Sequence, residues 1–213
     1  MIGWSISQPG TWGGRNRLWQ PRGHSMAHEL VRRMLTRSEV IRVREIDRRE
    51  VIEAVYYVVD GELVLRPEHY DMQGWPPGEM EKSIAWLLEM FDRGAWFRGV
   101  FDGERMVAVA ALDNKFIGAP PDMLQLAFLH VSRDYRGRGL GRDLFHAATA
   151  EARSRGARRM YVSATPSEHT INFYLALGCT LSPAPDPALF AIEPDDLHLE
   201  YALPAQGDGR PVA

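Results

Sequence analysis

Apolar residues recur along the chain at two spacings, and together these spacings predict strands alternating with helices. Residues Val40–Arg44 are predicted as a short strand. Asp47–Glu50 then has the form of a capping box, an N-cap acceptor with an acid three residues later. The residues behind it keep a helical spacing, so a helix is predicted on Val51, Ile52, Val55, Val58 and Val59. Glycines and prolines interrupt the pattern over residues 60–78.

A second amphipathic helix and a hairpin follow this interruption. The helix is predicted to end at Gly94, and its apolar face carries Met80, Ile84, Leu87, Leu88 and Phe91. Two apolar runs, Trp96–Phe101 and Met106–Leu112, flank the dipeptide Asp102-Gly103. An Asp-Gly pair between two such runs is a strong short-range signal for a β-hairpin.

The second half of the chain alternates strands with helices. Strands are predicted at Leu124–Val131, Arg159–Ser163 and Leu197–Tyr201. One helix is predicted to end at Gly156 and to carry Leu140, Leu144, Phe145, Ala148 and Ala152. Another is predicted to open with a second capping box, Thr165–Glu168, with Pro166 as its first residue, and to end at Gly178. The order β, α, α, β, β, β, α, β, α, β predicts an α/β fold, a mixed sheet with helices over it.

Composition changes mainly at the N-terminal end of the chain. Residues 1–25 are rich in Gly, Trp and Arg and contain no Asp or Glu. We interpret them as a poorly ordered extension, with a partner-binding or homodimer strap as the alternative. The folded domain is predicted at residues 39–203, and residues 204–213 are predicted as a flexible tail.

The overall composition excludes several classes of protein. Hydrophobic residues make up 45% and charged residues 25% of the chain, which is ordinary for a folded globular protein. Cys179 is the only cysteine, so no intramolecular disulfide or Cys-based metal site is expected, and no metal is predicted. A net charge of −3 argues against nucleic acid and anionic membrane as partners. With no apparent secretory signal or membrane span, a cytoplasmic, bacterial protein is expected.

The candidate chemistry lies in the glycine-rich stretch Arg136–Arg142, between a predicted strand and a predicted helix. Glycine lets the backbone turn tightly and approach a ligand, and a helix start presents unpaired N–H groups to an anion. The stretch therefore suits a pyrophosphate, although glycines here also permit close packing. It lacks the Gly-Lys-Ser/Thr ending of a P-loop, and Arg142 stands where a dinucleotide-binding fingerprint needs its third glycine.

The stretch resembles the signature of the GNAT acyltransferases, Arg/Gln-x-x-Gly-x-Gly/Ala behind a hydrophobic strand. Arg136, Gly139 and Gly141 fill its fixed positions. Residues 172–179 are similar to the family's Phe/Leu-Tyr…Leu-Gly-Phe segment. The resemblance implies a mostly antiparallel, twisted sheet of about six to seven strands with a splayed fourth strand, and acetyl-CoA or a related acyl-CoA as donor.

The resemblance also implies positions for the donor. Main-chain groups of Leu129–Val131 are expected to hold the pantetheine arm, and main-chain N–H groups of Gly137–Arg142 the pyrophosphate. The N–H of Leu129 is the candidate for polarising the thioester carbonyl. The full set of expected donor contacts is Leu129, His130, Val131, Arg136, Gly137, Arg138, Gly139, Leu140, Gly141, Arg142, Ser167 and Tyr174. Ser167 stands where many members have an Asn.

For catalysis the resemblance implies direct attack of an amine on the thioester. Tyr174 matches the tyrosine that acts as general acid towards the CoA sulfur. Some members carry a glutamate base where this chain has Gln125, so the proton must leave through water or through His130, Asp113 or Glu68. Cys179, in place of the usual Phe, is expected only to fill space.

The acceptor is predicted to be a small-molecule amine, with a protein N-terminus or a lysine as second choice. The segments Gly61–Gly78 and Pro183–Asp196 are expected to build its pocket. Glu193, Asp195 and Asp196 either attract a cationic acceptor or form a solvated turn. The alternative function is a non-catalytic acyl-CoA-binding module, because no obvious base is present.

Overall fold

The computed structural model describes residues 29–204; the predictions for residues 1–25 and for residues 205–213 of the tail lie outside this range. A seven-stranded sheet forms the centre of the fold. Its strands, in spatial order, are β1 (Val31–Met34), β4 (Trp96–Asp102), β5 (Arg105–Ile117), β6 (Met123–Val131), β7 (Arg159–Ala164), β9 (Leu197–Ala202) and β8 (Thr180–Leu181). All neighbouring strands pair antiparallel except β6 and β7. The predicted mostly antiparallel sheet is confirmed.

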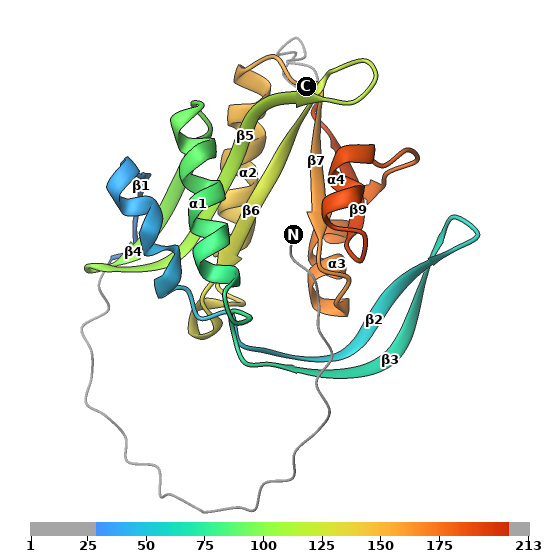
Figure 1. Cartoon of the computed structure of the whole chain (residues 1–213), viewed down its shortest axis with the longest axis horizontal. Coiled ribbons are helices and arrows are strands. Elements are labelled where there is room, and N and C mark those ends of the chain that lie inside the picture. The colour runs from blue at the N-terminus through green and yellow to red at the C-terminus, as the bar shows by residue number, and fades with distance from the viewer. Residues whose placement is uncertain (1–28, 205–213) are drawn as a thin grey trace, which may run out of the picture.

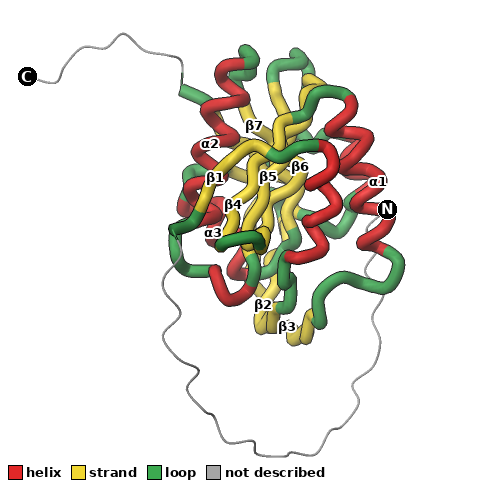
Figure 2. Tube along the Cα trace, turned by 90° about the vertical axis from the view of Figure 1, so that its left-hand side faces the viewer, coloured by secondary structure: helices red, strands yellow, loops and turns green. Residues whose placement is uncertain are grey.

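Helices cover both faces of this sheet (Figure 2). The 3₁₀ helix η1 (Arg37–Glu45) and α1 (Glu79–Asp92) pack on one face, over a core that includes Phe97 and Met106. Helix α2 (Leu140–Ser154) packs on the other, over a core that includes Leu112 and Val162. The remaining helices are η2 (Arg133–Tyr135), α3 (Glu168–Ala176) and α4 (Pro187–Ile192). In the described part of the chain, no helix is long and apolar enough to cross a membrane.

The predicted strand at Val40–Arg44 is wrong, because this stretch lies within η1. Val40 and Val43, three residues apart, are both fully buried, which matches the three-residue turn of a 3₁₀ helix. A capping box that we did not identify opens the helix. The Glu39 carboxylate accepts from the main-chain N–H of Thr36 at 3.0 Å.

The predicted helix at residues 51–59 is also wrong: the chain forms β2 (Glu50–Val59), which pairs with β3 (Glu62–Met72) as a separate two-stranded sheet. The side chain of Asp47 does not cap a helix; it accepts from the N–H of Arg49, two residues on, at 3.0 Å. β-branched and aromatic residues dominate β2, and they favour a strand. Figure 1 shows the β2–β3 hairpin projecting from the body of the fold as an arm.

Other predicted elements are confirmed with small shifts at their ends. The helix before Gly178 begins at Glu168, with Ser167 rather than Thr165 as its N-cap. The side chain of Ser167 accepts from the N–H of Thr170 at 3.3 Å. Strand β1, which the sequence pattern does not predict, pairs with β4 over its whole length.

Candidate active site

The parallel strands β6 and β7 separate, and the region between them is the candidate site. They pair only from Met123 to Gln125 on β6, against Arg159 to Tyr161 on β7. Beyond these residues the two strands diverge towards α3 and the base of the arm (Figure 1). We call the region between residues 126–131 of β6 and 162–164 of β7 the fork. The predicted splayed fourth strand is β6, the fourth strand in the sheet order.

A bulge on β6 starts this separation. Leu112 of β5 pairs with Leu126, but the next residue of β5, Ala111, pairs with Phe128. Ala127 is therefore an extra residue, and it changes the face to which the following side chains point. Leu126 accordingly lies in the core under α2, and Phe128 in the core under α1.

Beyond the bulge, the main chain of β6 directs groups into the fork that pair with no other described strand. The N–H of Ser132 donates to the carbonyl of Val107 at 2.8 Å. This bond shows which residues of β6 direct their main-chain groups towards β5 and which direct them away from it. In an antiparallel ladder every second residue directs its N–H and C=O away from the partner strand. Leu129 and Val131 are these residues, whereas the main-chain groups of His130 face Val109. The N–H predicted to polarise the thioester thus lies on the unpaired edge of β6.

The glycine-rich stretch after β6 presents a row of unpaired donors. Within the described residues, no acceptor bonds the consecutive main-chain N–H groups from Gly137 to Arg142. Gly137 has φ +72° and Gly139 has φ +83°, a left-handed conformation in which glycine is not penalised. Gly139 is the N-cap of α2, so the positive end of the helix dipole adds to these donors. The arrangement fits a diphosphate.

The side chain of Arg136 turns back towards the sheet. Its Nε donates to the Val131 carbonyl at 3.2 Å, and its Nη1 lies 3.2 Å from a carboxylate oxygen of Glu50. Arg136 thereby ties the end of β6 to the start of β2. Arg138 lies over the ring of Tyr135, 4.8 Å from its centroid, and is exposed beside the unpaired N–H groups.

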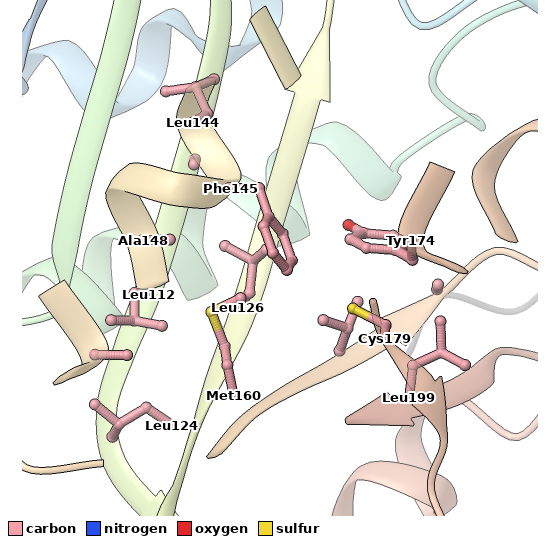
Figure 3. Close-up of a cluster of buried hydrophobic side chains, with 14 of the residues drawn as sticks. Leu112, Leu124, Leu126, Leu144, Phe145, Ala148, Met160, Tyr174, Cys179 and Leu199 are labelled. Atoms are coloured by element: carbon pink, nitrogen blue, oxygen red, sulfur yellow. The ribbon is translucent and has the colours of Figure 1, made fainter. Parts of the chain in front are cut away.

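Tyr174 comes from α3 and is 6% exposed. Its ring contacts the rings of Phe145 and Phe173, with centroids 6.1 and 5.0 Å away. The hydroxyl points from α3 towards β6 (Figure 3) and has no hydrogen-bond partner among the described residues. Burial raises the pKa of Tyr174 above its ordinary value, and the nearby Cys179 and Asp196 raise it further. Tyr174 therefore stays protonated at neutral pH, as a general acid must.

An aromatic cluster surrounds His130 on the β6 side of the fork. The His130 ring lies 4.4 Å from that of Phe128 and 6.4 Å from that of Trp75, and Arg48 covers Trp75 at 4.2 Å. Burial, followed by the positive charges of Arg48 and Arg136, lowers the pKa of His130 well below its ordinary value. Burial, followed by the charge of Arg136, lowers the pKa of Arg48 to about 10. These surroundings oppose a proton on His130.

An acidic turn faces this cluster from the other side. Asp196 directly precedes β9, whose first residue, Leu197, pairs with Ala164 at the end of β7. Burial raises the pKa of Asp196 to about 7; Glu193 and Asp195 add to this effect, and Arg48 opposes it. Burial also raises the pKa of Glu193, and a hydrogen bond with Ser163 opposes this shift.

A model of the acetyltransferase (GNAT) family matches residues 61–179, more than half of the chain. This range contains β6, the unpaired N–H groups and Tyr174. The chain belongs to the GNAT acetyltransferase family. It is accordingly an acyltransferase, as predicted from its sequence.

Solved structures share the fold at low sequence identity. A nourseothricin acetyltransferase has a TM-score of 0.61 and 20% identity, over 82% of this chain and 99% of the other. A streptothricin acetyltransferase from Bacillus anthracis, described as putative and solved with acetyl coenzyme A, has a TM-score of 0.58 and 13% identity, over 81% and 96%. The PaiA N-acetyltransferase from Thermoplasma acidophilum, in complex with coenzyme A, has a TM-score of 0.55 and 15% identity, over 82% and 99%. No curated protein sequence matches the chain significantly.

Several predicted residues of this GNAT protein lie away from the fork. Asp113 lies within β5, in the irregular stretch between Leu112 and Phe116 where the pairing with β6 is interrupted, and it forms an ion pair with Arg93 at 3.1 Å. Glu68 lies on the arm, where hydrogen bonds from Tyr57 and Tyr70 lower its pKa. Neither is placed to take a proton at the fork.

Two further predicted residues serve the packing. Ser167 is 2% exposed, its hydroxyl caps α3, and its main chain bridges to Val55 of the arm, so its contact with the donor stays a prediction. Cys179 lies in the core beside Tyr174 (Figure 3), and burial raises the pKa of its thiol to about 12. A thiol that stays protonated is a poor nucleophile, which agrees with the space-filling role.

Of the segments expected to build the acceptor pocket, the structure brings Trp75, Glu193 and Asp196 to the fork. Residues 62–72 of the first segment instead form strand β3 of the arm. Arg48 is the site residue that the sequence analysis missed. The only signal for it was its place in a basic run, Arg48-Arg49, and that run reads as an ordinary solvated face.

Proposed function

We propose that this protein transfers the acetyl group of acetyl-CoA directly to an amine of a small molecule. The observation that carries the proposal is the continuity of two sets of unpaired main-chain groups. In the described part of the chain, the free edge of β6 ends at the N–H of Val131, whose carbonyl is taken by Arg136, and the row of free N–H groups begins at Gly137, one short turn later. An elongated ligand with an amide-rich arm and a diphosphate matches both sets.

The residues of the chain supply the remaining parts of the reaction. The Leu129 N–H is a donor for the thioester carbonyl oxygen, where negative charge develops during attack. The Tyr174 hydroxyl is a proton source for the departing sulfur, and its raised pKa keeps the proton available. Acetyl-CoA itself supplies the activated acyl group.

A small molecule is preferred as acceptor because of the charges around the fork. Glu193 and Asp196 lie on one side and Arg48 on the other, all of them partly buried. Two of the similar structures are enzymes named for the small molecules nourseothricin and streptothricin. A protein N-terminus or a lysine remains the second choice, since another similar structure is an N-acetyltransferase for a ribosomal protein alanine.

Calorimetric titration with acetyl-CoA, and separately with free CoA, tests the donor. We expect micromolar binding of both. Thiol release is then measured with a panel of primary amines: alkylamines, diamines, amino-acid esters and aminoglycosides. Turnover with any of them supports the enzyme; binding of both nucleotides with no thiol release across the panel would favour the acyl-CoA-binding module. A folded sample that binds neither refutes the donor site.

A further inference from the structure

Four polar side chains gather at the fork without any hydrogen-bond partner in the described part of the chain: Arg48, His130, Tyr174 and Asp196. They come from four separate segments, namely the turn before β2, strand β6, helix α3 and the turn before β9. Buried and half-buried polar groups are normally paired within a folded protein, so this gathering of unpaired groups points to a ligand that pairs them.

Asp196 is the residue directly before β9, and it lies at the end of β7 that borders the fork, because its neighbour Leu197 pairs with Ala164. Leu197 belongs to the same buried core cluster as Tyr174. Among the residues that the structure describes, Asp196 makes one hydrogen bond, from its own N–H to the carbonyl of Glu193 at 3.2 Å. Within residues 29–204 the carboxylate oxygens therefore have no hydrogen-bond donor, and they lie at the end of the fork to which α3 brings the Tyr174 hydroxyl.

From this juxtaposition we infer that Asp196 is the base that takes the proton from the acceptor amine. The inference rests on the proposed acetyl transfer and supplies the base that Gln125 cannot be, because an amide does not accept a proton at neutral pH. His130 is a weaker choice, since its ring is surrounded by aromatic rings and by the positive charges of Arg48 and Arg136.

The proton balance of the step closes within the site. The nitrogen of the neutral amine bonds to the thioester carbonyl carbon, and the carbon–sulfur bond breaks. The nitrogen gives one proton to Asp196, and the sulfur gains one from Tyr174. The proton on Asp196 then restores the Tyr174 hydroxyl, so amine and acetyl-CoA become amide and free thiol with no net proton.

The environment of Asp196 suits a base that works near neutral pH. A carboxylate at its ordinary pKa is a weak acceptor for an amine proton. Burial and the negative charges of Glu193 and Asp195 bring the pKa of Asp196 to about 7, and Arg48 keeps it from rising further. At pH 7 and above, much of Asp196 is thus ionised and ready to accept a proton.

The test compares Asp196→Asn with Asp195→Asn, a matched control on the exposed neighbouring residue. Thiol release is followed from pH 5.5 to 9 with the fastest amine of the panel, and CoA affinity is measured for each variant. For Asp196→Asn we expect a loss of about 10²–10⁴-fold in kcat/KM and loss of the acidic limb of the pH profile, with CoA affinity unchanged. Asp195→Asn is expected to keep the rate at pH 8–9 and the CoA affinity, and to move the acidic limb to lower pH, because the charge of Asp195 raises the pKa of Asp196.

An Asp196→Asn protein that keeps its rate within threefold, with the wild-type pH profile, overturns the inference while leaving the acetyltransferase intact. A wild-type protein that turns over no amine would instead refute the proposed function. If Asp196→Asn fails to bind CoA because it misfolds, Arg48→Gln decides. Removing the positive charge raises the pKa of Asp196, so the acidic limb must move to higher pH; a limb that does not move counts against Asp196.

Discussion

Replacing Tyr174 by Phe removes one hydroxyl and tests the general acid directly. The structure separates its effects on stability and on catalysis. The hydroxyl makes no hydrogen bond to any described residue, so its removal breaks none, and the ring contacts with Phe145 and Phe173 remain. We therefore expect the free energy of unfolding to change by about 1 kcal/mol or less. The loss of a general acid lowers kcat by about 10²–10⁴-fold, or about 3–5 kcal/mol in activation free energy.

Tyr201 provides a matched control for this substitution. Its ring also contacts that of Phe145, with centroids 5.2 Å apart. Tyr201 lies away from the fork, however, because it pairs with Met160 of β7, and at this level β6 and β7 are still hydrogen-bonded to each other. Tyr201→Phe is expected to leave both kcat and CoA affinity unchanged.

The assay combines thiol release at saturating acetyl-CoA, calorimetric CoA affinity and urea unfolding for both variants. We expect Tyr174→Phe to lose turnover alone. A variant that keeps its turnover would refute the role of Tyr174 as acid. Equal losses of turnover and CoA affinity would show that the hydroxyl binds the donor rather than protonating the sulfur.

Two further predictions concern the glycine-rich turn and the first helix. Gly139→Leu places a side chain at φ +83° where its Cβ meets no atom within 4 Å, so it costs about 1–2 kcal/mol of stability and weakens CoA binding by more than tenfold. Gly103→Leu is the control: it lies at φ +56° in the equally open β4–β5 turn, so it carries the same backbone strain but is expected to keep its CoA affinity. If Gly139→Leu also kept its CoA affinity, the diphosphate would have to bind elsewhere. Hydrogen bonds from Arg33 and from the Thr36 N–H lower the pKa of Glu39 from 4.5 to about 2. The ionised Glu39 therefore stabilises the fold fully above about pH 4.5, and this stabilisation is lost as the pH falls towards 2. We expect Glu39→Gln to unfold at lower urea than the wild type at pH 7, and to lose less stability than the wild type between pH 7 and pH 2. A variant with the same pH dependence of stability as the wild type would contradict the role of Glu39.

Local chemistry alone determined the hairpin at Asp102-Gly103, the amphipathic helices α1 and α2, and the glycine-rich turn between β6 and α2. Each depends on residues within one short segment, such as a turn dipeptide, a stripe of apolar side chains or a run of glycines. Because these signals are complete within the segment, no distant contact is needed to form them. The family resemblance, which rests on the same turn and on residues 172–179, was visible for the same reason.

The arm contains a local hairpin signal that the sequence analysis gave less weight than the helical spacing of the apolar residues. Asp60-Gly61 is the same turn dipeptide as Asp102-Gly103, and the structure gives both residues positive φ, +51° and +82°, as a type I′ hairpin turn requires. The near-continuous apolar run before it satisfied a helical spacing as well as a strand. Its β-branched and aromatic residues, together with the turn, were the better guide.

Only the tertiary structure decided the composition of the site. The acidic run that ends at Asp196 is typical of a solvent-exposed turn, and the pair of arginines that contains Arg48 is typical of an exposed surface. Asp196 lies where β9 begins to pair with β7, and Arg48 covers Trp75 from the turn before β2, which is more than a hundred residues earlier in the sequence. Desolvation, which sets the pKa of both groups, depends on what other segments cover, and a local pattern carries no information about that. The sequence by itself thus determined the fold family and the donor turn, and the assembled fold decided which charged groups face the reaction.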